Sequence, residues 1–219
     1  MSKYISIFIS SLIAGFCITL GASTYLVCFT QSFGLKVVGA FLFCIGLFTI
    51  IHFKFWLFTG KVGFVLNNKP KYFLDLFVCL IGNLLGAFIL ASLIKVTRMG
   101  PTLIEAAKNV VASKQNDSWY SILLLAILCG IMIYIAVVGH EKTEYPLGKT
   151  IFAFFPIVLF ILLGFEHVVA NACYYTYAGV FNAKMVGYFA LMAIGNGIGS
   201  IFIDGAIKLI NYFKNKETN

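Results

Sequence analysis

The chain has 219 residues, of which 61% are hydrophobic and only 11% are charged, and its formal net charge is +8. A soluble domain carries about a quarter charged residues, so this composition excludes the ordinary soluble classes and predicts a polytopic helical membrane protein. The positive charge does not indicate nucleic-acid binding, because lysines gather at the inner surface of membrane proteins.

Six apolar segments follow one another along the chain, and short polar connectors separate them. They cover about residues 5–29, 36–66, 72–95, 118–139, 149–178 and 186–210. Each is long enough to cross the hydrocarbon core of a bilayer. The first segment is too long for the apolar core of a secretory signal and shows no cleavage site, so we expect it to be retained as a helix. The short connectors predict a single domain over residues 1–219.

The distribution of lysine and arginine predicts the orientation of these segments. With the N-terminus inside, more basic residues fall on the inner connectors and the C-terminal tail than on the outer connectors. Cytoplasmic loops carry such an excess. We therefore expect a multi-pass protein of the cytoplasmic membrane with both termini in the cytoplasm.

The second and fifth segments are unusually long, and polar or glycine residues interrupt them. In the second, "TIIHFKFWLFTGK" (49–61) places His52, Lys54 and Thr59 in an apolar stretch; in the fifth, Pro156 precedes "GFEHVVAN" (164–171). A helix broken at membrane depth exposes backbone groups that lipid cannot satisfy, so both breaks should face protein or an aqueous cavity. His52 itself has no motif around it, and we expect an interfacial or packing role for it.

The segments that follow the two breaks also resemble each other. The third carries "GNLLG" (82–86) and the sixth carries "GNGIG" (195–199). A broken segment followed by a glycine-asparagine motif thus occurs once in each half, over about residues 1–100 and 115–219. Each half has an odd number of spans, so the halves run in opposite directions through the membrane. Inverted repeats with broken helices predict a transport site near the midplane.

Taken together, "LFTGK" (57–61), "GNLLG", "GFEHVVAN" and "GNGIG" resemble the formate/nitrite transporter family. The resemblance extends from "AGFCITLG" (14–21) in the first segment to the sixth segment. It implies an all-α, aquaporin-like fold of six transmembrane helices in a homopentamer with one pore in each protomer. It also implies that the cargo is a small monovalent anion or its neutral acid, such as formate, nitrite, hydrosulfide or a short carboxylate.

The resemblance assigns roles to individual residues. Thr59 matches the threonine of the pore loop, His167 the central pore histidine, and Asn196 an asparagine near that histidine. Lys114 matches a lysine that faces the pore environment and attracts anions. The apolar residues that narrow the pore correspond to Phe43, Leu47, Leu57 and Phe160.

Two positions depart from the pattern of the family. Trp56 stands where an acidic residue often precedes the Leu-Phe-Thr of the loop, and Gly130 stands where an asparagine is common in the fourth span.

The adjacent Glu166 and His167 need a physical account, because moving a small ion to a low-dielectric site costs about 20 kcal/mol. A channel must supply dipoles at its narrowest point or let the anion cross as its neutral acid. His167 suits either task, and the sequence leaves open whether it donates a proton or only hydrogen-bonds. On a helix the Glu166 side chain would diverge from His167 by about 100°. We therefore predict a structural role for Glu166, accepting hydrogen bonds at the break or pairing with a lysine.

Other classes of function have less support in the sequence. The chain has no nucleotide motif, and we expect no organic cofactor and no metal site. Its six cysteines lie mostly inside spans and form no CxxC pair, which is typical of small buried side chains. A membrane enzyme would need His167, Glu166 and a cysteine to converge, and Cys129 and Cys173 lack the spacing of a metal site. The open alternative is a neutral-solute channel for ammonia, water or glycerol, although the chain lacks paired Asn-Pro-Ala motifs.

Overall fold

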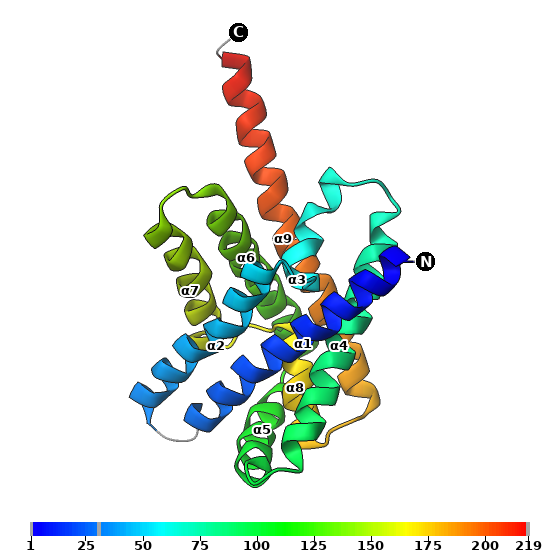
Figure 1. Cartoon of the computed structure of the whole chain (residues 1–219), viewed down its shortest axis with the longest axis vertical. Helices are drawn as coiled ribbons and strands as arrows, with labels where there is room; N and C mark the ends of the chain where they lie inside the picture. The colour runs from blue at the N-terminus through cyan, green and yellow to red at the C-terminus, as the bar shows by residue number, and fades with distance from the viewer. Residues whose placement is uncertain (1, 30–31, 218–219) are drawn as a thin grey trace.

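The computed structural model describes residues 2–29 and 32–217, and throughout these ranges the regular structure is helical (Figure 1). In chain order the elements are α1 (Ser2–Phe29), α2 (Phe33–Phe53), α3 (Phe58–Lys61), the 3-10 helix η1 (Val62–Asn67), α4 (Tyr72–Lys95), α5 (Gly100–Gln115), α6 (Trp119–Lys142), α7 (Pro146–Leu162), α8 (Val168–Ala178) and α9 (Ala183–Glu217).

Most of the long helices are transmembrane in length and composition. Five of the described helices are apolar enough and long enough to cross a membrane, namely α1, α2, α4, α6 and α9. The apolar helix α7 has 17 residues and is too short by the same measure. The chain is therefore a multi-pass membrane protein. Six spans remain a prediction, since that number requires α7 and α8 to be taken as one broken segment.

The helices form two repeats of opposite direction. In the first, α1 packs against α2 and α4; in the second, α6 packs in the same way against α7 and α9. Figure 1 shows that α1 runs away from the side of the molecule that holds both termini, whereas α6 runs back toward it. We call this side the termini face, and the opposite side, which carries α5, the α5 face. The expected all-α fold is confirmed, and the two sets of helices run in opposite directions as the sequence predicts.

The central helices of each repeat approach so closely that no side chain fits between them. A Cβ atom on Gly15 of α1 would overlap the backbone oxygen of Asn83 on α4, and one on Gly130 of α6 would overlap the backbone oxygen of Asn196 on α9. Glycine is therefore required at both crossings. The same contact explains why Gly130 occupies a position where the family resemblance suggests an asparagine.

The expectation of a short connector between the third and fourth segments is wrong. Residues 100–115 form the helix α5, which begins with Pro101 in its first turn and packs against α8. One side of α5 buries Leu103, Ala106 and Val111. The other side of α5 is polar. The helix as a whole is therefore not apolar enough for a transmembrane span, and its composition is typical of a loop. In the fold, α5 carries Lys114 over the second helix break.

Candidate functional site

The first helix break lies between α2 and α3. Helix α2 ends at Phe53, and Lys54 then adopts the left-handed conformation with φ 56° and ψ 34°. Residues 55–57 belong to no helix, Leu57 is extended, and α3 begins at Phe58. Left-handed backbone costs a residue with a side chain about 1–2 kcal/mol, so glycine is the usual choice at such a corner.

The second break, between α7 and α8, repeats this backbone course. Helix α7 ends at Leu162, Gly164 takes the left-handed conformation with φ 69°, residues 165–167 belong to no helix, and His167 is extended. The amide of Phe165 donates to the carbonyl of Phe160 at 2.9 Å. At the first break the amide of Phe55 donates in the same way to Ile50 at 3.0 Å. Lys54 and Gly164 thus occupy equivalent corners, each four residues before the first residue of the short helix.

An asparagine from α4 holds the first break together. The side chain of Asn83 accepts a hydrogen bond from the amide of Phe58 at 2.8 Å. It donates to the carbonyls of Ser11 and Trp56, both at 2.8 Å. Asn83 is fully buried, so these contacts replace the water that the broken backbone cannot reach in a membrane.

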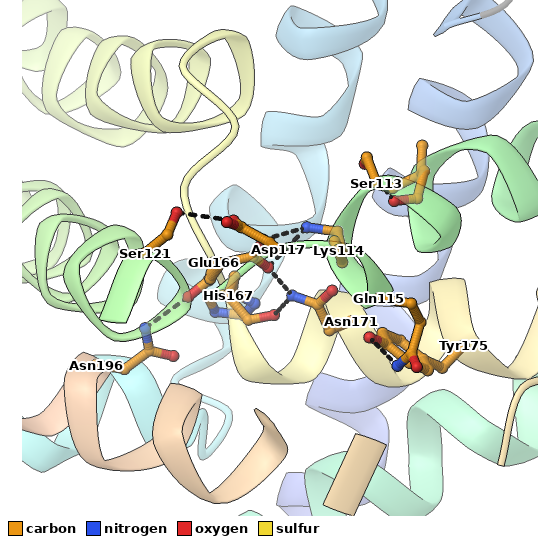
Figure 2. A network of polar contacts seen from close by, with 11 residues as sticks. Ser113, Lys114, Gln115, Asp117, Ser121, Glu166, His167, Asn171, Tyr175 and Asn196 are labelled. Carbon is orange, nitrogen blue, oxygen red and sulfur yellow. Dashed lines mark hydrogen bonds and ion pairs between the residues drawn. The ribbon is translucent and has the colours of Figure 1, made fainter. Parts of the chain in front are cut away.

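Asn196 from α9 makes the same three contacts at the second break. It accepts from the amide of Val168 at 3.1 Å and donates to the carbonyls of Ala126 and Glu166, both at 2.8 Å. Figure 2 shows its amide pointing at the backbone of Glu166. The family resemblance places Asn196 near the pore histidine, and the structure shows its polar atoms bonded to the backbone of the break on either side of His167.

His167 precedes α8, and its two ring nitrogens have different partners. Its Nδ1 lies 3.1 Å from the amide nitrogen of Ala170, and its Nε2 lies 2.9 Å from Oγ1 of Thr59. A backbone N–H can only donate, so Nδ1 is an acceptor and the proton of the neutral ring lies on Nε2. Nε2–H therefore donates to the Thr59 hydroxyl, and the hydroxyl proton of Thr59 is free to point elsewhere.

Apolar side chains surround this polar pair. The rings of Phe43 and Phe160 meet edge to face with centroids 5.8 Å apart, and Phe160 stacks on the His167 ring at 5.9 Å. Leu47 and Leu57 lie on the side toward the termini face. The side chains of these five residues are almost completely inaccessible to solvent. The structure thus brings together the four apolar residues, Thr59 and His167.

Two cavities approach this apolar layer from opposite faces. The α5-face vestibule has a volume of about 240 Å³, and Phe160, Glu166 and His167 form its inner end. The termini-face vestibule has a volume of about 430 Å³, and Leu47 and Leu57 are part of its wall. The layer that contains Thr59 and His167 therefore separates two open cavities.

Glu166 makes a buried ion pair beside the second break (Figure 2). Lys114 Nζ on α5 lies 2.6 Å and 2.7 Å from the two carboxylate oxygens of Glu166. Asn171 Nδ2 donates to the same carboxylate at 2.8 Å and to the carbonyl of His167 at 3.0 Å. The Lys114 and Glu166 side chains are only 11% and 3% exposed. Glu166 thus has the lysine partner proposed as one option from the sequence, and the charge of Lys114 is matched by this carboxylate.

The sequence missed two functional contributors that have recognisable signals. Asn83 is not among the residues to which the sequence gives a role, although the paired "GN" motifs mark equivalent positions in the two halves. Asn171 closes the quoted "GFEHVVAN" motif and lies one helical turn after His167, a spacing that brings side chains together.

Metal-ligating side chains do not gather in the described part of the chain. No group of three or more His, Cys, Asp or Glu side chains could hold a metal ion among residues 2–29 and 32–217. The six cysteines are free.

Comparison with known proteins identifies relatives over nearly the whole chain. The model of the family described as "Formate/nitrite transporter" matches residues 2–210. The "Uncharacterized transporter YrhG" of Bacillus subtilis is 30% identical over 194 residues, which cover 82% of this chain and 73% of the relative. The "Formate channel FocA" of Haemophilus influenzae is 28% identical, over 75% of this chain and 63% of the relative.

Solved structures share the fold. The "Pentameric formate channel with formate bound" superposes with a TM-score of 0.76 at 20% identity, covering 98% of each chain. The "FNT family ion channel" superposes with a TM-score of 0.78 at 19% identity, covering 94% of this chain and 90% of the other. At this level of identity the likeness establishes the fold.

Proposed function

The chain belongs to the formate/nitrite transporter family, and from that premise we propose that it moves small monovalent anions, together with a proton, across the cell membrane. The cargo class is formate, nitrite, hydrosulfide or a short carboxylate. The observation that carries the proposal is a single polar pair, Thr59 and His167, inside an apolar layer that separates two open vestibules.

The apolar layer sets the form in which the cargo crosses. Taking a small ion out of water into such surroundings costs about 20 kcal/mol in an idealised estimate. An anion that accepts a proton in the vestibule avoids this cost, because it then crosses the rings of Phe43 and Phe160 as a neutral acid. The proton is taken from water on one side and released on the other, so one proton travels with each anion.

His167 in this scheme is a hydrogen-bond donor that keeps its proton. A second proton would have to go on Nδ1, and this would break the hydrogen bond from the amide of Ala170 that holds the start of α8. The neutral ring donates through Nε2 to Thr59. The Thr59 hydroxyl then offers its own proton as a hydrogen bond to the passing molecule. Thr59 contacts the cargo, and His167 orients Thr59.

The surrounding polar residues hold this pair in place. Asn196 bonds the backbone on either side of His167, and the Glu166 carboxylate accepts from Asn171, which also donates to the carbonyl of His167, so both act as positioning residues. Lys114 uses two donors on Glu166, and its third N–H remains available to an anion in the α5-face vestibule, whose wall it forms. Because Glu166 neutralises the charge of Lys114, we propose that Lys114 attracts an anion only at hydrogen-bonding distance.

We further propose that the chain assembles as a homopentamer in the cell membrane, with one pore in each protomer and both termini in the cytoplasm. The structural relative described as pentameric covers 98% of this chain. Large apolar side chains such as Phe41, Phe77 and Phe155 are exposed on the isolated protomer and need lipid or neighbouring copies as partners.

The test is uptake into proteoliposomes of formate, nitrite, hydrosulfide and lactate across a range of external pH. We expect uptake of at least one of these anions to increase as external pH falls, because more protons are available to accompany it. The His167→Ala variant should lose this uptake. Lys142→Ala, which changes an exposed lysine outside the layer, is the matched control.

The same vesicles distinguish the proposed anion transport from the alternative of a neutral-solute channel. Vesicles that exclude all four anions but admit ammonia or glycerol would contradict the proposal and favour a neutral-solute channel. Uptake that is independent of pH would contradict the accompanying proton.

A further inference from the structure

The termini-face vestibule carries an unbalanced set of positive charges. Its wall includes Lys54, Lys61 and Lys149, and the only acidic residue in the wall is Glu141. None of these lysines forms an ion pair with another residue of the described ranges 2–29 and 32–217. Lys61 contacts the Trp56 ring at 5.8 Å, which leaves its charge uncompensated. The cavity therefore has a formal excess of two positive charges.

The α5-face vestibule has no such excess. Its wall contains Lys36 and Lys114 against Asp117 and Glu166, and Lys114 is bound to Glu166 at 2.6 Å. The two cavities lead to the same apolar layer, so any general need of the pore for positive charge would apply to both. A general excess of lysine at a cytoplasmic face would account for exposed loop lysines, but it does not account for Lys54, which lies at the helix break and lines the cavity.

Lys54 occupies a backbone position that favours a different residue. Its φ of 56° is the only positive φ of a non-glycine residue in the described chain, and the equivalent corner of the second break is Gly164. The repeat therefore accommodates glycine at this corner, where glycine has no steric cost. A lysine side chain at this corner points to a use for its charge in the vestibule wall that it helps to form.

The size and the end wall of the cavity indicate which anions it suits. A volume of about 430 Å³ is within the usual range for ligand sites, about 300–1,000 Å³. Leu47 and Leu57 close it toward the pore, and each is 1% exposed. An anion with two or more charges stays charged after gaining one proton, so it cannot pass the apolar layer as a neutral acid. It can still be attracted by the three lysines.

We propose that the termini-face vestibule is a binding site for a small polyvalent oxyanion, held by Lys54, Lys61 and Lys149, and that the bound anion blocks the pore from this face. Phosphate compounds and di- or tricarboxylates share the required chemistry. The block rests on the proposed transport function, whereas the binding does not.

Binding is tested first on purified protein in detergent, with pyrophosphate as the probe and titration calorimetry as the measurement. We expect the variant Lys54→Met/Lys149→Met to bind about tenfold more weakly than the wild type, because two of the three cations are lost. Wild-type binding should weaken as salt is added. Lys71→Met, an exposed lysine outside the cavity wall, is the matched control and should bind as the wild type does. The proposed binding site would be contradicted if the wild type did not bind pyrophosphate, or if the double variant bound it as tightly as the wild type.

The block is tested in membrane vesicles sorted by the accessibility of a C-terminal tag. Pyrophosphate at the termini face should inhibit formate uptake, and pyrophosphate at the α5 face should not. The double variant should transport formate but resist the inhibitor. Equal inhibition from both faces, or none from the termini face, would overturn the block. If the protein binds pyrophosphate in a lysine-dependent way but moves no anion, the site stands and the proposed transport function fails.

Discussion

The two helix breaks have the same backbone and present different side chains. Both have a left-handed corner, three residues outside any helix and an asparagine that bonds the backbone of the break. Where the first break has Lys54, Trp56 and Leu57, the second has Gly164, Glu166 and His167. At the pore, the second break presents the polar His167 and the first presents the apolar Leu57. In the vestibule beside each break, the charge of Lys114 is matched by Glu166 at the second break, whereas Lys54 at the first break has no acidic partner in the described part of the chain.

The two breaks share the contacts that maintain the fold and differ in the contacts that could serve transport. The contacts that recur in both breaks satisfy backbone groups that a membrane cannot hydrate, so they serve the fold. The contacts that occur in only one break, above all His167 with Thr59 and Glu166 with Lys114, are the candidates for a role in transport.

The largest effect is expected from removing a shared asparagine. Asn83→Leu and Asn196→Leu should each destabilise the fold strongly, since each leaves one N–H and one carbonyl of the broken backbone without a partner, at about 1–3 kcal/mol per group, and removes a further hydrogen bond to a helix carbonyl. Thermal unfolding of the purified variants measures this. Asn109→Leu, at an exposed position of α5, is the control and should fold. A variant that folds with only one break impaired would show that the breaks are not equivalent.

The next effect concerns the unshared ion pair. Glu166→Gln should destabilise the protein by about 3–5 kcal/mol, because it leaves the Lys114 charge buried without its partner. Trp56→Phe, at the equivalent position of the first break, should cost less than about 1 kcal/mol, the size of an exposed cation–π contact.

Chemical denaturation compares these variants with the double variant Lys114→Met/Glu166→Gln, which should recover part of the loss. If Glu166→Gln is as stable as the wild type, the ion pair is not the reason for a carboxylate at this position.

The smallest effects concern the two left-handed corners, and they should have opposite signs. Lys54→Gly should stabilise the fold by about 1 kcal/mol because it relieves the left-handed backbone. Gly164→Ala should destabilise it by a similar amount, since a Cβ there meets no atom within 4 Å and the cost is in the backbone alone. Unfolding midpoints measure both changes. Shifts of the same sign would contradict the equivalence of the two corners.

Much of this architecture can be predicted from the sequence. The apolar runs are long and the polar interruptions are few, so the spans and both breaks are recognisable without a structure. The predicted third segment, 72–95, coincides with α4. Thr59, His167 and the four apolar residues were identified through the resemblance to the family, and the structure brings them together.

The remaining features depend on contacts between distant parts of the chain. Asn83 bonds Phe58 across 25 residues, and Lys114 reaches Glu166 across 52. Hydrophobic periodicity contains no information on such pairs. Helix α5 was missed because a half-buried amphipathic helix has the composition of a polar connector, and only its packing against α8 distinguishes the two.

The central claim is that the Thr59 hydroxyl, oriented by His167, is the polar contact for cargo inside the apolar layer. The most direct measurement is the initial rate of formate uptake into proteoliposomes by Thr59→Val and Thr59→Ser. Valine keeps the shape without the hydroxyl, and serine keeps the hydroxyl. We predict that Thr59→Val loses about a hundredfold in rate, the size of one lost donor in a water-excluded site, while Thr59→Ser stays within a few-fold of the wild type. Equal rates for the valine variant and the wild type would contradict the account.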